Sequence, residues 1–124
     1  MQDLGLKRLR EHLQVEPAEY PTTRKIGATP AERAADIHAA FADPEITVIM
    51  ASIGGSDQFK VLRHLDPVVL QANPKASFGY SDNTNLLVYL GIIGFHGGST
   101  IVIVIPYGGS MTVDGSNRTV TVTY

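Results

Sequence analysis

Residues 29–90 alternate between segments with helix start and stop signals and short apolar runs typical of strands. In "TPAERAADIHAAFADP", Thr29 can cap a helix, Pro30 suits its first position, and Glu32 completes a capping box. Pro44 ends this helix. "EITVIMAS" follows as a run that is apolar without alternation, which is typical of a parallel strand covered on both faces. This order favours an α/β domain with a mainly parallel sheet.

The other elements expected in the first 90 residues fit the same order. An amphipathic helix is predicted at residues 3–13, where Leu4, Leu6, Leu9 and Leu13 recur at helical spacing. Further helices are expected from "FKVLRHL", from "DPVVLQANP" with Asp66 as its cap, and from "SDNTNLLVYL", and a strand is expected from "KASFG". The predicted buried stripe of the helix after Thr29 consists of Ala34, Ile37, Ala40 and Phe41.

The last third of the chain has a different character. Of all the charged side chains, only Asp114 and Arg118 lie beyond Asp82. "GIIGFH" and "STIVIVI" are strand-like runs around Gly97-Gly98, and "SMTV" and "RTVTVTY" flank the turn-like "DGSN". We therefore predict a three-layer, flavodoxin-like domain with an antiparallel β extension from about residue 92. Residues 1–98 form the α/β part, and residues 99–124 extend the same domain.

Length and composition narrow the functional classes. At 124 residues the chain is one domain, and its net charge of −2 gives no indication of a nucleic-acid partner or an anionic membrane surface. The absence of cysteine excludes disulfides and thiol chemistry. The charged N-terminus lacks the apolar region of a signal peptide, and "TIVIVIPY" is too short to span a bilayer. We expect a cytoplasmic protein without a membrane partner.

The stretch "FGYSDNTNLL" places Ser81 between a predicted strand and a predicted helix. Gly79 to Asn83 resemble a nucleophile elbow, with Asn83 where the second glycine usually stands. At such a turn the hydroxyl projects clear of the sheet, and the N–H of Asp82 could stabilise an oxyanion. The simpler interpretation is that Ser81 or Asp82 only caps the helix.

Gly54-Gly55 is a second candidate feature because it directly follows a predicted parallel strand. Two glycines there bring bare backbone N–H groups to the carboxyl edge of the sheet, where open α/β folds bind ligands. A plain glycine turn is the alternative. The occurrence of "SIGGSDQ" and "GYSDNT" at two strand ends favours a functional site.

Residues 4–98, including "GATPAERAADIHAAFADPEITVIMASIGG" and "LDPVVLQANPKASFGYSDNTNLLVYLGIIGFHGG", resemble the N-terminal half of the LD-carboxypeptidase family of serine peptidases. The resemblance implies that Ser81 is the nucleophile and that the N–H groups of Asp82 and Gly55 form the oxyanion hole. It also implies that Gly54 and Tyr80 bind substrate. The implied substrate is a small murein-like peptide cleaved at an amide next to a free carboxylate, with no metal or other cofactor.

The chain departs from that family in two respects. The family takes its catalytic glutamate and histidine from a second, C-terminal domain, which this chain lacks. His12 and His38 are expected to be solvated on helices and His64 to end a helix, which leaves His96 as the least implausible replacement base. Three glutamates are expected to be surface charges: Glu11, Glu16 and Glu19.

The family's first strand is the second departure, because no equivalent precedes residue 3. The run "TIVIVIPYGGS" resembles that strand, so it is either the same strand moved to the C-terminus or part of a foreign hairpin. The chain is accordingly either a serine hydrolase domain without its acid and base, or a non-enzymatic module that binds peptides or itself. The poorly charged C-terminal strands predict a homodimer.

Overall fold

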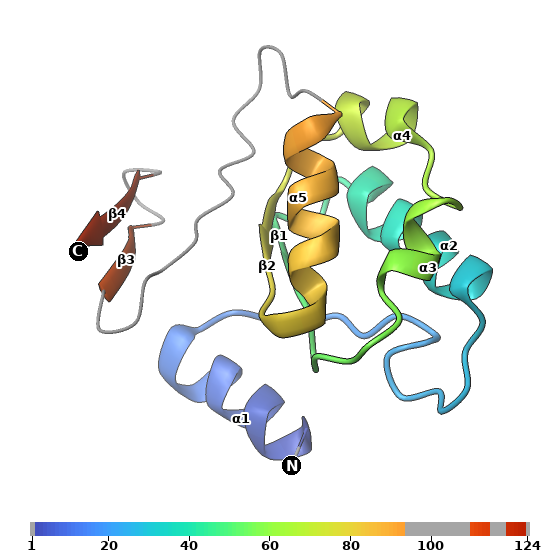
Figure 1. Cartoon of the computed structure of the whole chain (residues 1–124). Coiled ribbons are helices and arrows are strands. Elements are labelled where there is room, and N and C mark those ends of the chain that lie inside the picture. The colour runs from blue at the N-terminus through green and yellow to red at the C-terminus, as the bar shows by residue number, and fades with distance from the viewer. Residues whose placement is uncertain (1, 94–109, 115–118, 124) are drawn as a thin grey trace.

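The computed structural model describes residues 2–93, 110–114 and 119–123 (Figure 1). These residues form an α/β structure with a small parallel sheet, as the sequence predicts. In chain order the elements are α1 (Gln2–Leu13), α2 (Pro30–Ala42), β1 (Val48–Met50), α3 (Phe59–Leu62), α4 (Pro67–Ala72), β2 (Ala76–Phe78), the 3₁₀ helix η1 (Ser81–Asn83), α5 (Thr84–Ile92), β3 (Ser110–Asp114) and β4 (Thr119–Thr123).

The sheet that positions the site consists of β1 and β2, paired in parallel from Val48 opposite Ala76 to Met50 opposite Phe78. A parallel pair needs a crossover, and α3 and α4 supply it. The N–H of Ala51 also donates to the Phe78 carbonyl, at 2.9 Å. Both strands therefore end at the same edge, where the chain enters the glycine loop after β1 and the serine turn after β2.

The predicted helix starts are confirmed for α2 and α4. The Thr29 side chain accepts from the Glu32 N–H at 3.2 Å, while the Glu32 carboxylate accepts from the Thr29 N–H at 2.8 Å, which completes the capping box. The Asp66 carboxylate caps α4 by accepting from the Val68 N–H at 2.8 Å. These contacts are local, so the sequence spacing alone determines them.

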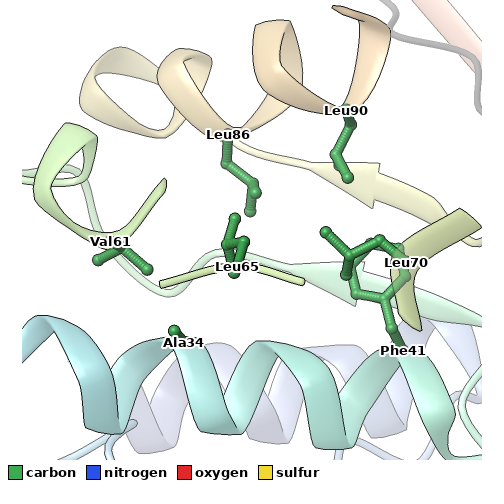
Figure 2. Packing of buried hydrophobic residues seen from close by; sticks show 7 residues of the cluster. All are labelled: Ala34, Phe41, Val61, Leu65, Leu70, Leu86 and Leu90. Atoms are coloured by element: carbon green, nitrogen blue, oxygen red, sulfur yellow. The ribbon is translucent and has the colours of Figure 1, made fainter. Parts of the chain in front are cut away.

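The hydrophobic core lies between the helices and one face of the sheet (Figure 2). Ala34 and Phe41 of α2 face Leu86 and Leu90 of α5, and three residues from the crossover fill the space between them: Val61, Leu65 and Leu70. Of the predicted stripe on α2, Ala34, Ala40 and Phe41 are buried, and Ile37 packs partly against the cluster. This packing fixes α5 against the strands, and α5 in turn fixes the serine turn that precedes it (Figure 1).

One expectation about burial is wrong. β1 is not covered on both faces, because Val48 is 46% exposed and Met50 is 58% exposed while Ile49 packs on the core. Successive side chains of a strand point to opposite faces, so only the Ile49 face is covered in the described part of the chain. The helix predicted at residues 3–13 is confirmed as α1, in which no residue is buried and Leu4 and Leu13 are exposed.

The predicted strand in "GIIGFH" is also wrong at its start, because Gly91 and Ile92 belong to α5. The β extension therefore does not begin at about residue 92. An apolar run does not distinguish a short strand from a buried helix by periodicity, and here the helix continues. β3 and β4 around "DGSN" pair antiparallel, with Ser110 opposite Thr123, as a sheet separate from β1 and β2.

The strand expected in "STIVIVI" and the turn expected at Gly97-Gly98 lie outside the described residues. Across residues 2–93, 110–114 and 119–123, none of the helices has the length and apolar character needed to span a membrane.

Candidate functional site

Ser81 lies at the sharp turn between β2 and α5. Its backbone φ is 60°, in the left-handed region that residues other than glycine rarely adopt. Such a conformation costs of the order of 1–3 kcal/mol and persists only where the surroundings enforce it. The serine itself is exposed, and it opens the 3₁₀ turn η1 that leads into α5. The geometry is that of a strained strand–turn–helix elbow with a serine at its tip.

Gly79 and Asn83 account for the tightness of this turn. A Cβ added at Gly79 would lie 2.6 Å from the Cβ of Asn83, closer than two carbon atoms can approach. The elbow pattern usually has small residues at both positions. In this chain Gly79 alone provides the space, and Asn83 can therefore carry a side chain.

The glycine pair lies directly against the elbow. A Cβ added at Gly54 would lie 3.2 Å from the Cβ and 3.5 Å from the Oγ of Ser81. A Cβ added at Gly55 would lie 3.3 Å from the Oδ2 of Asp82. Residues with side chains would crowd Ser81 and Asp82 here, so the two glycines permit a close approach of the two strand ends.

The candidate oxyanion donors near the serine turn are the backbone N–H groups of Asp82 and Gly55. The N–H of Asp82 lies in the first turn of η1, where helical N–H groups have no partner within the helix. In residues 2–93 neither this N–H nor that of Gly55 has a protein acceptor. Asp82 directly follows the exposed Ser81, and Gly55 directly follows the Gly54 that approaches it. Unpaired N–H groups near a nucleophile are the donors that can stabilise an oxyanion.

The Asp82 side chain does not cap its own helix. In the first turns of η1 and α5 no side-chain cap is made, so the simpler interpretation of Ser81 or Asp82 as a cap is wrong. The Asp82 Oδ2 instead accepts from the N–H groups of Asp57, at 2.9 Å, and Gln58, at 2.7 Å. Asp82 therefore holds the start of α3 against the elbow.

Asn83 makes a second contact with the loop. Its Nδ2 donates to the Ile53 carbonyl at 2.8 Å and to the Tyr80 carbonyl at 3.1 Å. The sequence predicts neither contact, because it offers Asp82 only as a possible helix cap and indicates no role for the Asn83 side chain. The only signal available was the polar pair directly after Ser81, and its partners lie about 25 to 30 residues away.

Arg33 of α2 supports the loop from outside. Its guanidinium donates to the Asp57 carboxylate at 2.8 Å and to the Gln58 side-chain oxygen at 2.5 Å. Gln58 is only 5% exposed, so this oxygen needs a partner. The same arginine lowers the pKa of Asp57 by hydrogen bonding to its carboxylate. The loop is thus tied to both α2 and the elbow.

A cavity of about 450 Å³ opens at the carboxyl edge of the two strands. Among the residues that line it are Arg33, Ser52, Gly54, Gly55, Asp57 and Asp82. Open α/β folds bind ligands at this edge. Tyr80, which the resemblance assigns to substrate binding, projects into solvent with 87% of its surface exposed.

No base accompanies the serine in the described residues. Within residues 2–93, no hydrogen bond joins Ser81 to a histidine or to a carboxylate. His38 is not solvated as expected: it is partly buried, and its Nε2 accepts from the Asp66 N–H at 2.8 Å. His12 and His64 are exposed, and His96 lies outside the described residues.

The glutamates weighed as alternatives lie in surface ion pairs. Glu11 lies 3.7 Å from Lys7, Glu16 lies 2.9 Å from Arg10, and Glu19 lies 2.7 Å from Arg24. In the described part of the chain, no group of three or more histidine, aspartate or glutamate side chains could hold a metal ion.

Residues 2–97 match the family model of the LD-carboxypeptidase N-terminal domain. The chain is 46% identical over 56 residues to a putative carboxypeptidase of Treponema pallidum (strain Nichols), which covers 45% of this chain and 17% of that protein. It is 40% identical over 74 residues to the microcin C7 self-immunity protein MccF of Escherichia coli, which covers 56% of this chain and 22% of that protein. The chain thus spans about a fifth of the length of these relatives.

Solved structures give the same relationship. The wild-type apo state of the microcin C7 self-immunity protein MccF matches with a TM-score of 0.65 and 34% identity, over 71% of this chain and 28% of that one. MccF in complex with aspartyl sulfamoyl adenosine matches with a TM-score of 0.62 and 35% identity, over 68% of this chain and 28% of that one. A further MccF structure contains adenosine monophosphate.

Proposed function

Because the chain belongs to the LD-carboxypeptidase family, matching its N-terminal domain, we propose that it is the nucleophile-bearing part of a serine carboxypeptidase-type hydrolase. The proposed substrate is a small murein-like L,D-peptide, cleaved at the amide next to its free carboxylate. The observation that carries this proposal is Ser81, which is exposed at a left-handed turn against Gly54. The small ligands bound by MccF are consistent with a small-molecule substrate.

In the proposed reaction, the Ser81 Oγ attacks the carbonyl carbon of the scissile amide and gives its proton to a base. The negative charge that develops on the carbonyl oxygen is stabilised by the N–H groups of Asp82 and Gly55. The C–N bond then breaks, the leaving amine takes a proton, and water hydrolyses the acyl-enzyme. Gly54 and Tyr80 would contact the substrate beside the nucleophile.

We further propose that this chain alone is a very slow enzyme. A serine hydroxyl is a weak nucleophile unless an adjacent base removes its proton, and the described residues bring no histidine to Ser81. What remains in such cases is oxyanion stabilisation and binding, about 10³-fold over water at best. The general base and acid would come from outside the described residues, either from His96 of this chain or from another part of the enzyme.

Hydrolysis of an L,D-tetrapeptide by this chain tests the proposal, with and without added imidazole to replace the base. We expect a trace rate that imidazole raises in the wild type and in Ser56→Ala, an exposed loop serine that serves as the matched control. Ser81→Ala should lose both the rate and the response. Equal rates in Ser81→Ala and wild type would refute the role of Ser81.

A second candidate function is that of a non-enzymatic module that binds peptides or itself. The exposed apolar side chains of Val48 and Met50 favour it, because a partner could cover them. We propose that the complete domain is three-layered and flavodoxin-like, with the β3–β4 pair as its antiparallel extension, and that it forms a homodimer. Self-association that is unaffected by Ser81→Ala, without imidazole-dependent hydrolysis, would favour this function over the first.

A further inference from the structure

We propose that the side chains of Asp82 and Asn83 are positioning groups. They fix the loop after β1 that contains Gly54 and Gly55, and with it the proposed oxyanion site, to the turn at Ser81. The inference rests on the proposed function for its catalytic meaning. The structural part, that the elbow holds Gly54-Gly55 in place, can be tested without any reaction.

The two residues hold the loop on opposite sides of the glycine pair. Asn83 donates to the Ile53 carbonyl, directly before Gly54, at 2.8 Å. The Asp82 carboxylate accepts from the backbone N–H groups of Asp57 and Gln58, which follow the glycine pair, at 2.9 and 2.7 Å. Glycine has more conformational freedom than any other residue, so a loop with two of them needs such restraints to keep one geometry.

Asp82 has two roles in this arrangement. Its backbone N–H is one proposed oxyanion donor, and its carboxylate restrains the loop that carries the other donor, Gly55. The carboxylate lies so close that a Cβ at Gly55 would meet its Oδ2 at 3.3 Å. The hydrogen bonds of Asp82 to Asp57 and Gln58 therefore limit how far the two donors can move apart. An oxyanion hole needs this preorganisation, since donors that must reorganise during the reaction stabilise the transition state less.

Further contacts hold the restraining groups themselves. Asn85 donates to the Asp82 Oδ1 at 3.0 Å and to the Asp82 carbonyl at 2.8 Å, which fixes the carboxylate. Arg33 holds Asp57 and Gln58 from the side of α2. Side chains locked by such outer hydrogen bonds keep a functional constellation within the tolerance that catalysis needs.

Four variants of the full chain test the proposal. Asp82→Ala removes the acceptor, whereas Asp82→Asn keeps an oxygen for the same two N–H groups. Asn83→Asp replaces the donor facing the Ile53 carbonyl with an acceptor. Asn73→Ala is the matched control, because it removes a similar amide-to-carbonyl bond, 2.9 Å to Val69, at the end of α4.

The first measurement is the NMR order parameter of the Gly54 and Gly55 amides. We expect values near 0.85 in wild type, Asp82→Asn and Asn73→Ala, and values below about 0.6 in Asp82→Ala and Asn83→Asp. Rigid glycines in both disruptive variants would overturn the proposal. If Asp82→Ala does not fold, the same test is made by comparing the order parameters of the Gly54 and Gly55 amides in Asn83→Asp and in Asp82→Asn.

The second measurement is the affinity of a peptide boronate, in which the Ser81 oxygen adds to boron and its proton passes to solvent. We expect the two disruptive variants to weaken binding by up to about 10²-fold, the lower end of the effect of losing one oxyanion donor. Equal binding by all folded variants would overturn the positioning role. A boronate that does not bind wild type would refute the proposed function alone, because the order parameters still decide whether the elbow holds the loop.

Discussion

Replacing Gly79 with alanine should destabilise the domain through a single steric conflict. The added Cβ would lie 2.6 Å from the Asn83 Cβ, a backbone-anchored atom that no rotamer change can move, and 3.7 Å from the Ala51 Cβ, an ordinary contact. Relieving the first contact requires β2 and the elbow to separate, and overpacking of this kind typically costs about 1–3 kcal/mol. Gly79 does not have a positive φ, so alanine can adopt its backbone conformation. Alanine also lowers the conformational entropy of the unfolded chain, and this stabilisation of about 0.4–1 kcal/mol offsets part of the steric cost.

The net loss in unfolding free energy should therefore be about 1–2 kcal/mol. With a urea slope of about 1–3 kcal/mol/M, the midpoint should fall by about 0.5–1 M. Urea unfolding followed by circular dichroism measures this shift. Gly5→Ala is the matched control, because nothing lies within 4 Å of its added Cβ in α1, where alanine is a better helix former.

A double-mutant cycle with Asn83→Gly isolates the conflict. Asn83→Gly alone should lose stability, because the amide bonds to Ile53 and Tyr80 disappear. In that background Gly79→Ala should cost nothing, so the two changes couple by about 1–3 kcal/mol. Two results would refute the steric reasoning. One is a Gly79→Ala variant as stable as wild type; the other is a Gly79→Ala substitution that costs the same unfolding free energy in the Asn83→Gly background as in wild type.

Three further predictions concern strain, pH and assembly. Ser81→Gly should raise stability by about 1 kcal/mol in urea unfolding, because glycine adopts a φ of 60° without strain, and should abolish boronate binding; a loss of stability would contradict this. Hydrogen bonds from Lys25 and Thr29 hold the pKa of Glu32 at about 2, below its ordinary 4.5, so its stabilising contribution is complete above about pH 4.5 and is lost as the pH falls through 2. Glu32→Gln should accordingly flatten the stability profile in that window, and an unchanged profile would argue against it. Sedimentation at micromolar concentration should detect a homodimer formed through the C-terminal strands, whereas a monomeric mass at every concentration would exclude one.

Local chemistry explains which features could be predicted from the sequence. The capping box of Thr29 and Glu32 and the Asp66 cap involve residues within three positions of each other, so spacing determines them. The glycine pair and the serine each follow a strand, and the parallel pairing of those strands brings both to one edge. A correct reading of two strands was therefore enough to place Ser81 near Gly54.

The features that were missed depend on contacts between distant segments. The Asp82 carboxylate could have faced solvent, a substrate or its own helix, and only the packing of α3 beside the elbow selects Asp57 and Gln58. His38 is similar, since its partner Asp66 lies at the start of α4, 28 residues away. The continuation of α5 through Ile92 could not be separated from a strand, because an apolar run fits both where its neighbours are unknown.

The parallel pairing of β1 with β2 also determines how the chain can fold. Val48 can pair with Ala76 only when the chain closes the long loop that contains α3 and α4, which costs conformational entropy. The hydrogen bonds within α2 and its N-terminal capping box are short-range, and helices form much faster than such strand pairings. Non-local pairing of this kind slows folding. The strained serine turn follows β2 directly, so we expect its geometry to form together with this late pairing of the strands.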